Sequence, residues 1–179
     1  MNKIRRISQF FKWFFILLFI ALPIMYAIFW LNAPIPMSSL AATSGLIPSG
    51  TQIMQPLSLE TKFLSFVVAL IPLSIDLLVL YFLIRLFMYF ERGEIFSLEN
   101  VKNIKRIGYT IFLGQLFTIV YQLLITTVLT WNNPAPYRVA IFSFTGTNFG
   151  LLLAALLIIL VSWIMAEGYK LKEEQEYTI

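Results

Sequence analysis

Four long apolar runs constrain this chain more than any other feature of its sequence. They cover residues 13–31, 63–89, 108–131 and 148–166. A helix needs about 20 apolar residues to cross the hydrocarbon core of a bilayer. Backbone groups inside a bilayer must be paired within the protein, and these runs lack the alternation of barrel strands. The sequence therefore predicts an all-α integral membrane protein, a single-domain bundle of four transmembrane helices.

The residue types that are missing narrow the chemistry. Charged residues make up 12% of the chain, about half the share that is typical of soluble domains. Cys and His are absent, which removes the usual metal ligands, thiol nucleophiles and proton shuttles. There is no Gly-rich phosphate loop or nucleophile elbow. We therefore expect no enzymatic activity, no cofactor, no metal and no direct contact with nucleic acid.

The distribution of basic residues predicts the orientation. Eleven of the 13 lysines and arginines lie in the amino-terminal segment, in or beside the connector of residues 90–107, or in the tail of residues 167–179. Basic residues near helix ends mark the cytoplasmic side. Both termini are therefore predicted to be cytoplasmic, in a bacterial cytoplasmic (inner) membrane. The four tryptophans lie near span ends, where their rings favour the membrane interface.

The connector has the signals of a turn followed by a helix. Gly93 can adopt the positive φ that a chain reversal needs. Ser97 is a candidate N-cap, and Phe96 and Val101 are spaced for a hydrophobic staple across it. We expect a short helix at the membrane surface that runs into the third span. Its basic residues either only set topology and contact lipid phosphates, or form a docking surface together with the tail.

The two predicted outer loops, residues 32–62 and 132–147, allow two readings. The first is rich in Pro, Ser, Thr and Gly. The second contains YRVAIFSFTG, which is rich in β-branched and aromatic residues. Short extracytoplasmic strands could pair across the two loops into a cap, or both loops could be irregular and lie on the headgroups.

Asp76 lies near the middle of the second span, where a charged group is costly and often functional. In the third span, Gln115, Thr118, Gln122 and Thr126 form one helical stripe. Antiparallel packing of the two spans would bring the stripe to Asp76, which we expect to face the bundle interior. These polar residues are either interhelical hydrogen-bonding groups or a proton or ligand site of a small transporter or channel subunit. A homo-oligomer would provide room for a pore.

Two segments resemble the bacterial "domain of unknown function 2975" family of small four-span membrane proteins. In the connector the family pattern is Gly-x-x-Phe-Ser/Thr-x-x-Asn, a basic stretch and Ile-Gly. The matching residues are Gly93, Phe96, Ser97, Asn100, Ile107 and Gly108. In the tail they are Glu167, Gly168, Leu171, Glu174, Thr178 and Ile179. Gln175 and Tyr177 depart from the Asn and apolar residue that the family more often has.

The resemblance implies the four-span topology and supplies no catalytic role. Such proteins are often encoded beside a small helix-turn-helix regulator, which suggests a regulatory protein at the cytoplasmic face as partner. The tail is acidic, with apolar residues between and after the acidic ones. It therefore either docks on the partner as a strand or short peptide, or is a solvated terminus. The hypothetical partner-binding residues are Gly93, Phe96, Ser97, Asn100, Glu174, Thr178 and Ile179.

Overall fold

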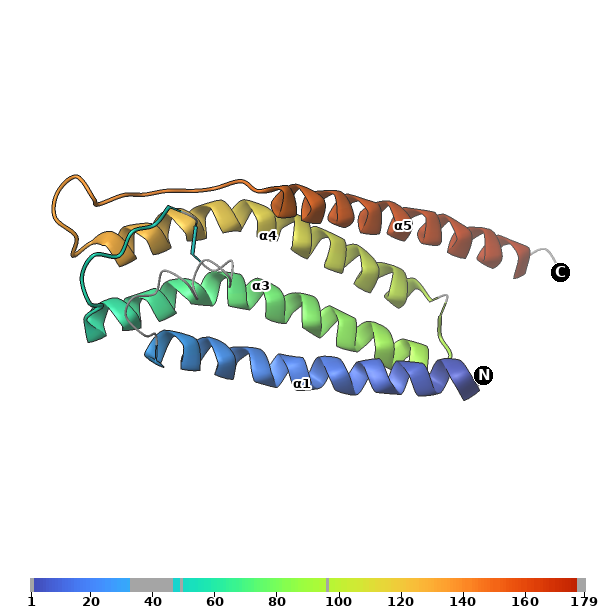
Figure 1. The fold of residues 1–179 in the computed structure, drawn as a ribbon. Coiled ribbons are helices and arrows are strands. Elements are labelled where there is room, and N and C mark those ends of the chain that lie inside the picture. The colour runs from blue at the N-terminus through green and yellow to red at the C-terminus, as the bar shows by residue number, and fades with distance from the viewer. Residues whose placement is uncertain (1, 33–46, 49, 96, 177–179) are drawn as a thin grey trace. The chain divides into compact units, whose positions relative to one another are not determined.

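The computed structural model describes residues 2–32, 47–48, 50–95 and 97–176 and contains four long helices (Figure 1). They are α1 (Asn2–Asn32), α3 (Leu59–Glu91), α4 (Leu98–Thr130) and α5 (Gly146–Glu176). No strand occurs among the described residues. The prediction of an all-α, four-helix membrane protein is confirmed.

All four helices are long and apolar enough to cross a membrane. The share of the apolar stretch that is buried inside the protein is lowest in α1, at 6%, and highest in α4, at 28%. Most apolar side chains therefore face outward, which fits lipid as the surrounding medium and does not fit water. At about 1.5 Å per residue, each helix is roughly 50 Å long. Its ends therefore extend beyond a hydrocarbon core about 30 Å thick.

Three helices extend well past the predicted spans, and the first of them, α1, begins at Asn2, eleven residues before its predicted span. The helix α4 begins at Leu98 and continues without a break into the third apolar run, which confirms the predicted connector helix that runs into this span. The helix α5 continues to Glu176, beyond the predicted span end at Ala166. Residues 167–176 of the tail are therefore helical in the single chain and do not fray, and the predicted docking of the tail on a partner stays a prediction.

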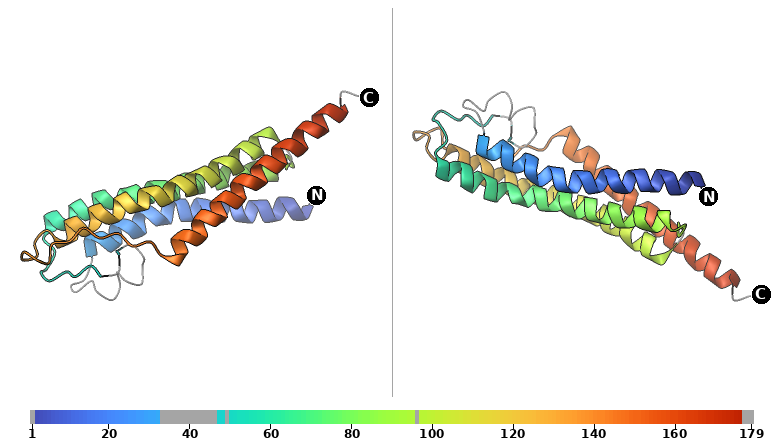
Figure 2. Two further views of the ribbon diagram at one scale, coloured as in Figure 1. Left: turned by 90° about the horizontal axis from the view of Figure 1, so that it is seen from above. Right: turned by 90° about the horizontal axis from the view of Figure 1, so that it is seen from below.

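Contacts divide the chain into two compact units. The first consists of Met1–Ile20, Ile75–Leu113 and Thr147–Ile179, and so contains part of every helix. At one end of this unit lie the start of α1, the turn between α3 and α4, and the last residues of α5 (Figures 1 and 2). We call this the charged end.

The second unit consists of Ala21–Ser74 and Gly114–Gly146. Its core contains Trp30, Ala69, Tyr121, Ile125 and Leu129. Trp30 is completely buried, so its ring packs inside the protein, and its predicted position at the membrane interface stays a prediction. The other three tryptophans are more than half exposed. The ring of Trp30 contributes its large apolar area to this core, although its N–H has no hydrogen-bond partner among the described residues.

Candidate functional site

The turn between α3 and α4 is fixed by backbone hydrogen bonds. Gly93 has φ of 84°, as predicted. Its N–H donates to the carbonyl of Phe90, and the N–H of Glu94 donates to the carbonyl of Tyr89, both at 3.1 Å. This pair of bonds is the Schellman motif, which pairs the last free carbonyls of a helix. A side chain at Gly93 would strain the backbone, because L-residues disfavour this region.

Ser97 begins α4 as an N-cap, as predicted. Its hydroxyl oxygen accepts a hydrogen bond from the N–H of Asn100 at 3.3 Å. Its carbonyl accepts one from the N–H of Val101 at 3.1 Å. The first bond pairs a donor that the first turn of a helix would otherwise leave free, and the second is the first regular backbone bond of α4. Phe96, and with it the predicted staple, lies outside the described residues.

Asn100 ties α4 back to the turn. Its side-chain N–H₂ group donates to the carbonyl of Glu94 and, at 3.0 Å, to that of Ile95. The residue is completely buried. Its partner-binding role stays a prediction, and a partner could reach the amide only if the turn opened. One turn later, Asn103 is also completely buried, although no pattern in the sequence singled it out.

Glu91 holds α1 to α3 at the charged end. Its carboxylate accepts hydrogen bonds from Lys12 at 2.6 Å and from Gln9 at 2.8 Å. The side chains of Glu91 and Lys12 are each about one-fifth exposed. Nearby, the rings of Phe11 and Phe87 stack with centroids 5.2 Å apart. The sequence did not predict these bonds. Their residues are far apart in the chain and meet only because α1 packs on α3.

Positive charge dominates the charged end. Its described cations are Lys3, Arg5, Arg6, Lys12, Arg85, Arg92, Lys102, Lys105, Arg106 and Lys170. Several lie over aromatic rings, which fixes their direction. Arg106 is 5.7 Å from the centroid of Phe82, and Lys105 is 5.9 Å from that of Tyr109. The surface thus combines oriented cations with apolar rings.

The acidic counterpart is the end of α5. Glu174 is exposed, as are Glu167 and Leu171. Lys170 pairs with Glu167 at 3.3 Å within one helical turn, a surface pair of little energetic consequence. Thr178 and Ile179, which the sequence predicts to bind a partner, lie outside the described residues. The described part of the tail is therefore a helix with a charged, accessible surface.

The predicted intramembrane site is divided between the two units. Asp76 belongs to the first unit, and Gln115, Thr118 and Gln122 belong to the second. Asp76 is exposed on the single chain, which differs from the predicted position facing the bundle interior. Thr118 donates to the carbonyl of Gly114 in its own helix at 2.9 Å. The proton or ligand role of these residues stays a prediction.

The polar stripe of α4 has a structural role that the sequence did not reveal. It binds an extended segment, residues 139–143, that runs along α4 (Figure 1). The N–H of Val139 donates to the Thr130 hydroxyl at 3.1 Å. The N–H of Ile141 donates to Thr126 at 3.0 Å. The N–H of Ser143 donates to Oε1 of Gln122 at 2.8 Å.

The spacing explains this ladder. Two extended residues advance about 6.6–6.8 Å, and four helical residues advance about 6.0 Å. Alternate residues of the segment therefore meet every fourth residue of α4. Phe142, between two paired positions, and Phe144, directly after the last of them, are exposed. The segment is extended, as its strand-like composition predicts, but its backbone bonds to side chains of α4. Strands that pair across the loops do not form among the described residues.

Asn133 joins the two described loop segments of the second unit. Its Oδ1 accepts a hydrogen bond from the N–H of Met54 at 3.1 Å. Its Nδ2 donates to the carbonyls of Gln52 at 2.7 Å and Tyr137 at 3.1 Å. Only 1% of the residue is exposed. A single buried amide thus makes the connection between the loops that paired strands would otherwise have made.

Comparisons with known proteins agree with the resemblance seen in the sequence. The model of the family described as Protein of unknown function (DUF2975) matches residues 11–179, which is almost the whole chain. No curated protein and no solved structure matches it. Within the part of the chain that the structure describes, no group of three or more Asp and Glu residues could hold a metal ion.

Proposed function

We propose that this chain, which belongs to the DUF2975 family, is a regulatory membrane protein that binds a cytoplasmic partner through its charged end. The observation that carries the proposal is the extension of α5. The helix continues past its apolar run to Glu176, with the acidic side chains at 167, 173 and 174 exposed. In this proposal the charged end faces the cytoplasm of a bacterial cell, as the basic residues predict.

The extension suits a basic partner. Acidic side chains on an exposed helix attract a positively charged surface, and Leu171, which is 56% exposed, offers an apolar anchor among them. A small helix-turn-helix regulator has such a surface, because it must bind DNA phosphates. Binding to α5 would then compete with DNA for the regulator. The proposed role needs no catalytic step.

The α3–α4 turn would provide a fixed platform beside this helix. Its Schellman motif, its Ser97 cap and the Asn100 side chain pair its backbone internally. A preorganised surface loses little conformational entropy when a partner binds. The turn therefore favours recognition of a folded partner.

The transport alternative has less support. A substrate site in the polar stripe would need free polar groups. Gln122 and Thr126 instead hold the backbone of the extended segment. Asp76 is exposed on the single chain, in the other unit.

A crosslinking pull-down from membranes tests the proposal. The intact chain is compared with a variant that lacks residues 172–179, and with the double variant Glu173→Gln, Glu174→Gln. The matched control is Glu60→Gln, which removes an exposed carboxylate in the second unit. We expect a soluble, basic DNA-binding protein with the intact chain and the control, and a loss of capture with both tail variants.

Added salt should weaken capture, because the attraction between exposed charges is screened within about 8–10 Å at physiological ionic strength. Capture by the intact chain of nothing except other copies of itself would contradict the proposal. Equal capture by the tail deletion would also contradict it, since the partner would then bind elsewhere.

A further inference from the structure

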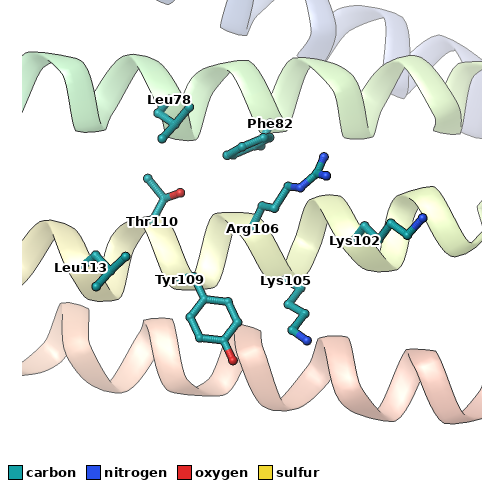
Figure 3. A pocket seen from close by; sticks show the side chains of 8 residues that line it. All are labelled: Leu78, Phe82, Lys102, Lys105, Arg106, Tyr109, Thr110 and Leu113. Atoms are coloured by element: carbon teal, nitrogen blue, oxygen red, sulfur yellow. The ribbon is translucent and has the colours of Figure 1, made fainter.

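A pocket of about 370 Å³ lies between α3 and α4 in the first unit (Figure 3). Three cations line one end of it, namely Lys102, Lys105 and Arg106. Leu78 and Leu113 line the other end. Along α4, Lys102 and Leu113 are separated by roughly 16 Å, from the rise of about 1.5 Å per residue. The pocket therefore changes from cationic to apolar along the helix axis.

Two of the three cations lie near aromatic rings, and the third pairs with a carboxylate. Arg106 points toward α3 (Figure 3) and lies 5.7 Å from the ring centroid of Phe82. Lys105 lies 5.9 Å from the ring of Tyr109. Lys102 pairs with Glu99 at 2.8 Å. One carboxylate beside three cations leaves this end of the pocket with net positive charge.

The apolar end is open to the surroundings of the protein. Leu78 is 45% exposed and Leu113 is 49% exposed. Tyr109 and Thr110 lie between the cations and the leucines, and each has a hydroxyl group. Passing along α4, the pocket thus offers cations, then hydroxyl groups, then an apolar surface. A phospholipid has the same order: phosphate, glycerol esters, acyl chain.

We propose that this pocket binds one anionic phospholipid, with the phosphodiester at Lys105 and Arg106 and an acyl chain along Leu78 and Leu113. The guanidinium of Arg106 can donate two parallel hydrogen bonds to phosphate oxygens. An acidic peptide would also satisfy the cations. It would leave the exposed leucines unused, so the lipid uses more of the observed surface.

The binding test uses the full-length protein in detergent. Native mass spectrometry measures binding of phosphatidylglycerol and of phosphatidylcholine with the same acyl chains. Glycerol phosphate serves as the headgroup without chains, and polyglutamate serves as the acidic peptide. We expect a tightly bound phosphatidylglycerol, weaker phosphatidylcholine, and little binding of glycerol phosphate or polyglutamate.

Two kinds of variant separate the charged and apolar parts of the site. The double variant Lys105→Gln, Arg106→Gln should weaken phosphatidylglycerol binding about tenfold or more, because charge-assisted hydrogen bonds are lost. Leu113→Trp keeps every cation but fills the apolar end, and it should also weaken binding. Arg92→Gln is the matched control, since it removes a cation from the same end of the unit outside this pocket.

Several results would overturn the assignment. Equal binding of phosphatidylglycerol and phosphatidylcholine would show that the cations do not select an anionic lipid. An equal loss with Arg92→Gln would indicate diffuse surface charge and no defined site. Tight binding of glycerol phosphate would indicate a soluble phosphate ligand, and tight binding of polyglutamate would indicate a peptide. Circular dichroism of each variant verifies that helix content is retained.

Discussion

Substituting Gly108 tests how α4 packs on α5. A Cβ atom at this position would lie 2.6 Å from Cγ1 of Ile159, and 3.2 Å from both the carbonyl oxygen of Ala155 and the backbone N of Ile159. Carbon atoms in favourable contact are about 3.5–4.0 Å apart. A different rotamer of Ile159 could relieve only the first contact, because the other two involve backbone. The helix α5 would have to move away from α4.

The magnitude follows from two opposing effects. Overpacking a close contact costs about 1–3 kcal/mol, while replacing Gly with Ala inside a helix gains up to about 1 kcal/mol. We therefore expect Gly108→Ala to lower the free energy of unfolding by about 1–2 kcal/mol. Gly150→Ala is the matched control, because it is also helical and a Cβ atom there would meet nothing within 4 Å. This control should be neutral or slightly stabilising.

The assay is denaturant or thermal unfolding of the purified protein in detergent micelles, followed by circular dichroism. The double variant Gly108→Ala, Ile159→Ala adds a second check. Removing the Ile159 side chain abolishes the shortest contact, so the double variant should lose less stability than the sum of the single losses. If Gly108→Ala were as stable as Gly150→Ala, the close packing of α4 on α5 would be refuted.

Three further substitutions test the polar residues. Thr126→Val leaves the part-buried N–H of Ile141 without its acceptor and should cost about 1–2 kcal/mol of stability, whereas Thr127→Val, at an exposed position whose hydroxyl donates to a carbonyl of its own helix, should be neutral in the same unfolding assay. Asn133→Asp replaces the amide that donates to two loop carbonyls and should expose the loops to limited proteolysis. Asn132→Asp, at an exposed neighbour whose amide donates to the Thr61 hydroxyl at 3.4 Å, should not, because a carboxylate can accept a hydrogen bond from that hydroxyl. Asp76→Asn should leave capture of the cytoplasmic partner intact; loss of capture with this variant would favour the intramembrane site.

Much of the helical architecture is decided locally, which is why it can be predicted from the sequence. A run of about 20 apolar residues in a bilayer forms a helix, because an unpaired backbone group there costs several kcal/mol. The turn at Gly93 and the cap at Ser97 involve residues within a few positions of each other. Their hydrogen bonds therefore follow from residue type and order alone.

The roles of several polar residues depend on partners that are distant in the sequence. Gln122 and Thr126 were recognisable as a stripe, but the pattern of one helix does not tell which group will bind it. In the structure that group is the backbone of residues 139–143. Trp30 shows the same limit, because its ring suits either the interface or a core.

The sequence by itself determined four membrane-crossing helices, the charged end, and the turn and cap that join α3 to α4. The physical reason is that hydrophobic length, charge distribution and capping act over one helix or one turn. Only the tertiary structure decided that Glu91 pairs with Lys12, that Asn133 bonds to two loops, and that α5 packs closely against Gly108. Those outcomes depend on which surfaces meet when helices pack, and the spacing of residues along the chain does not encode that directly.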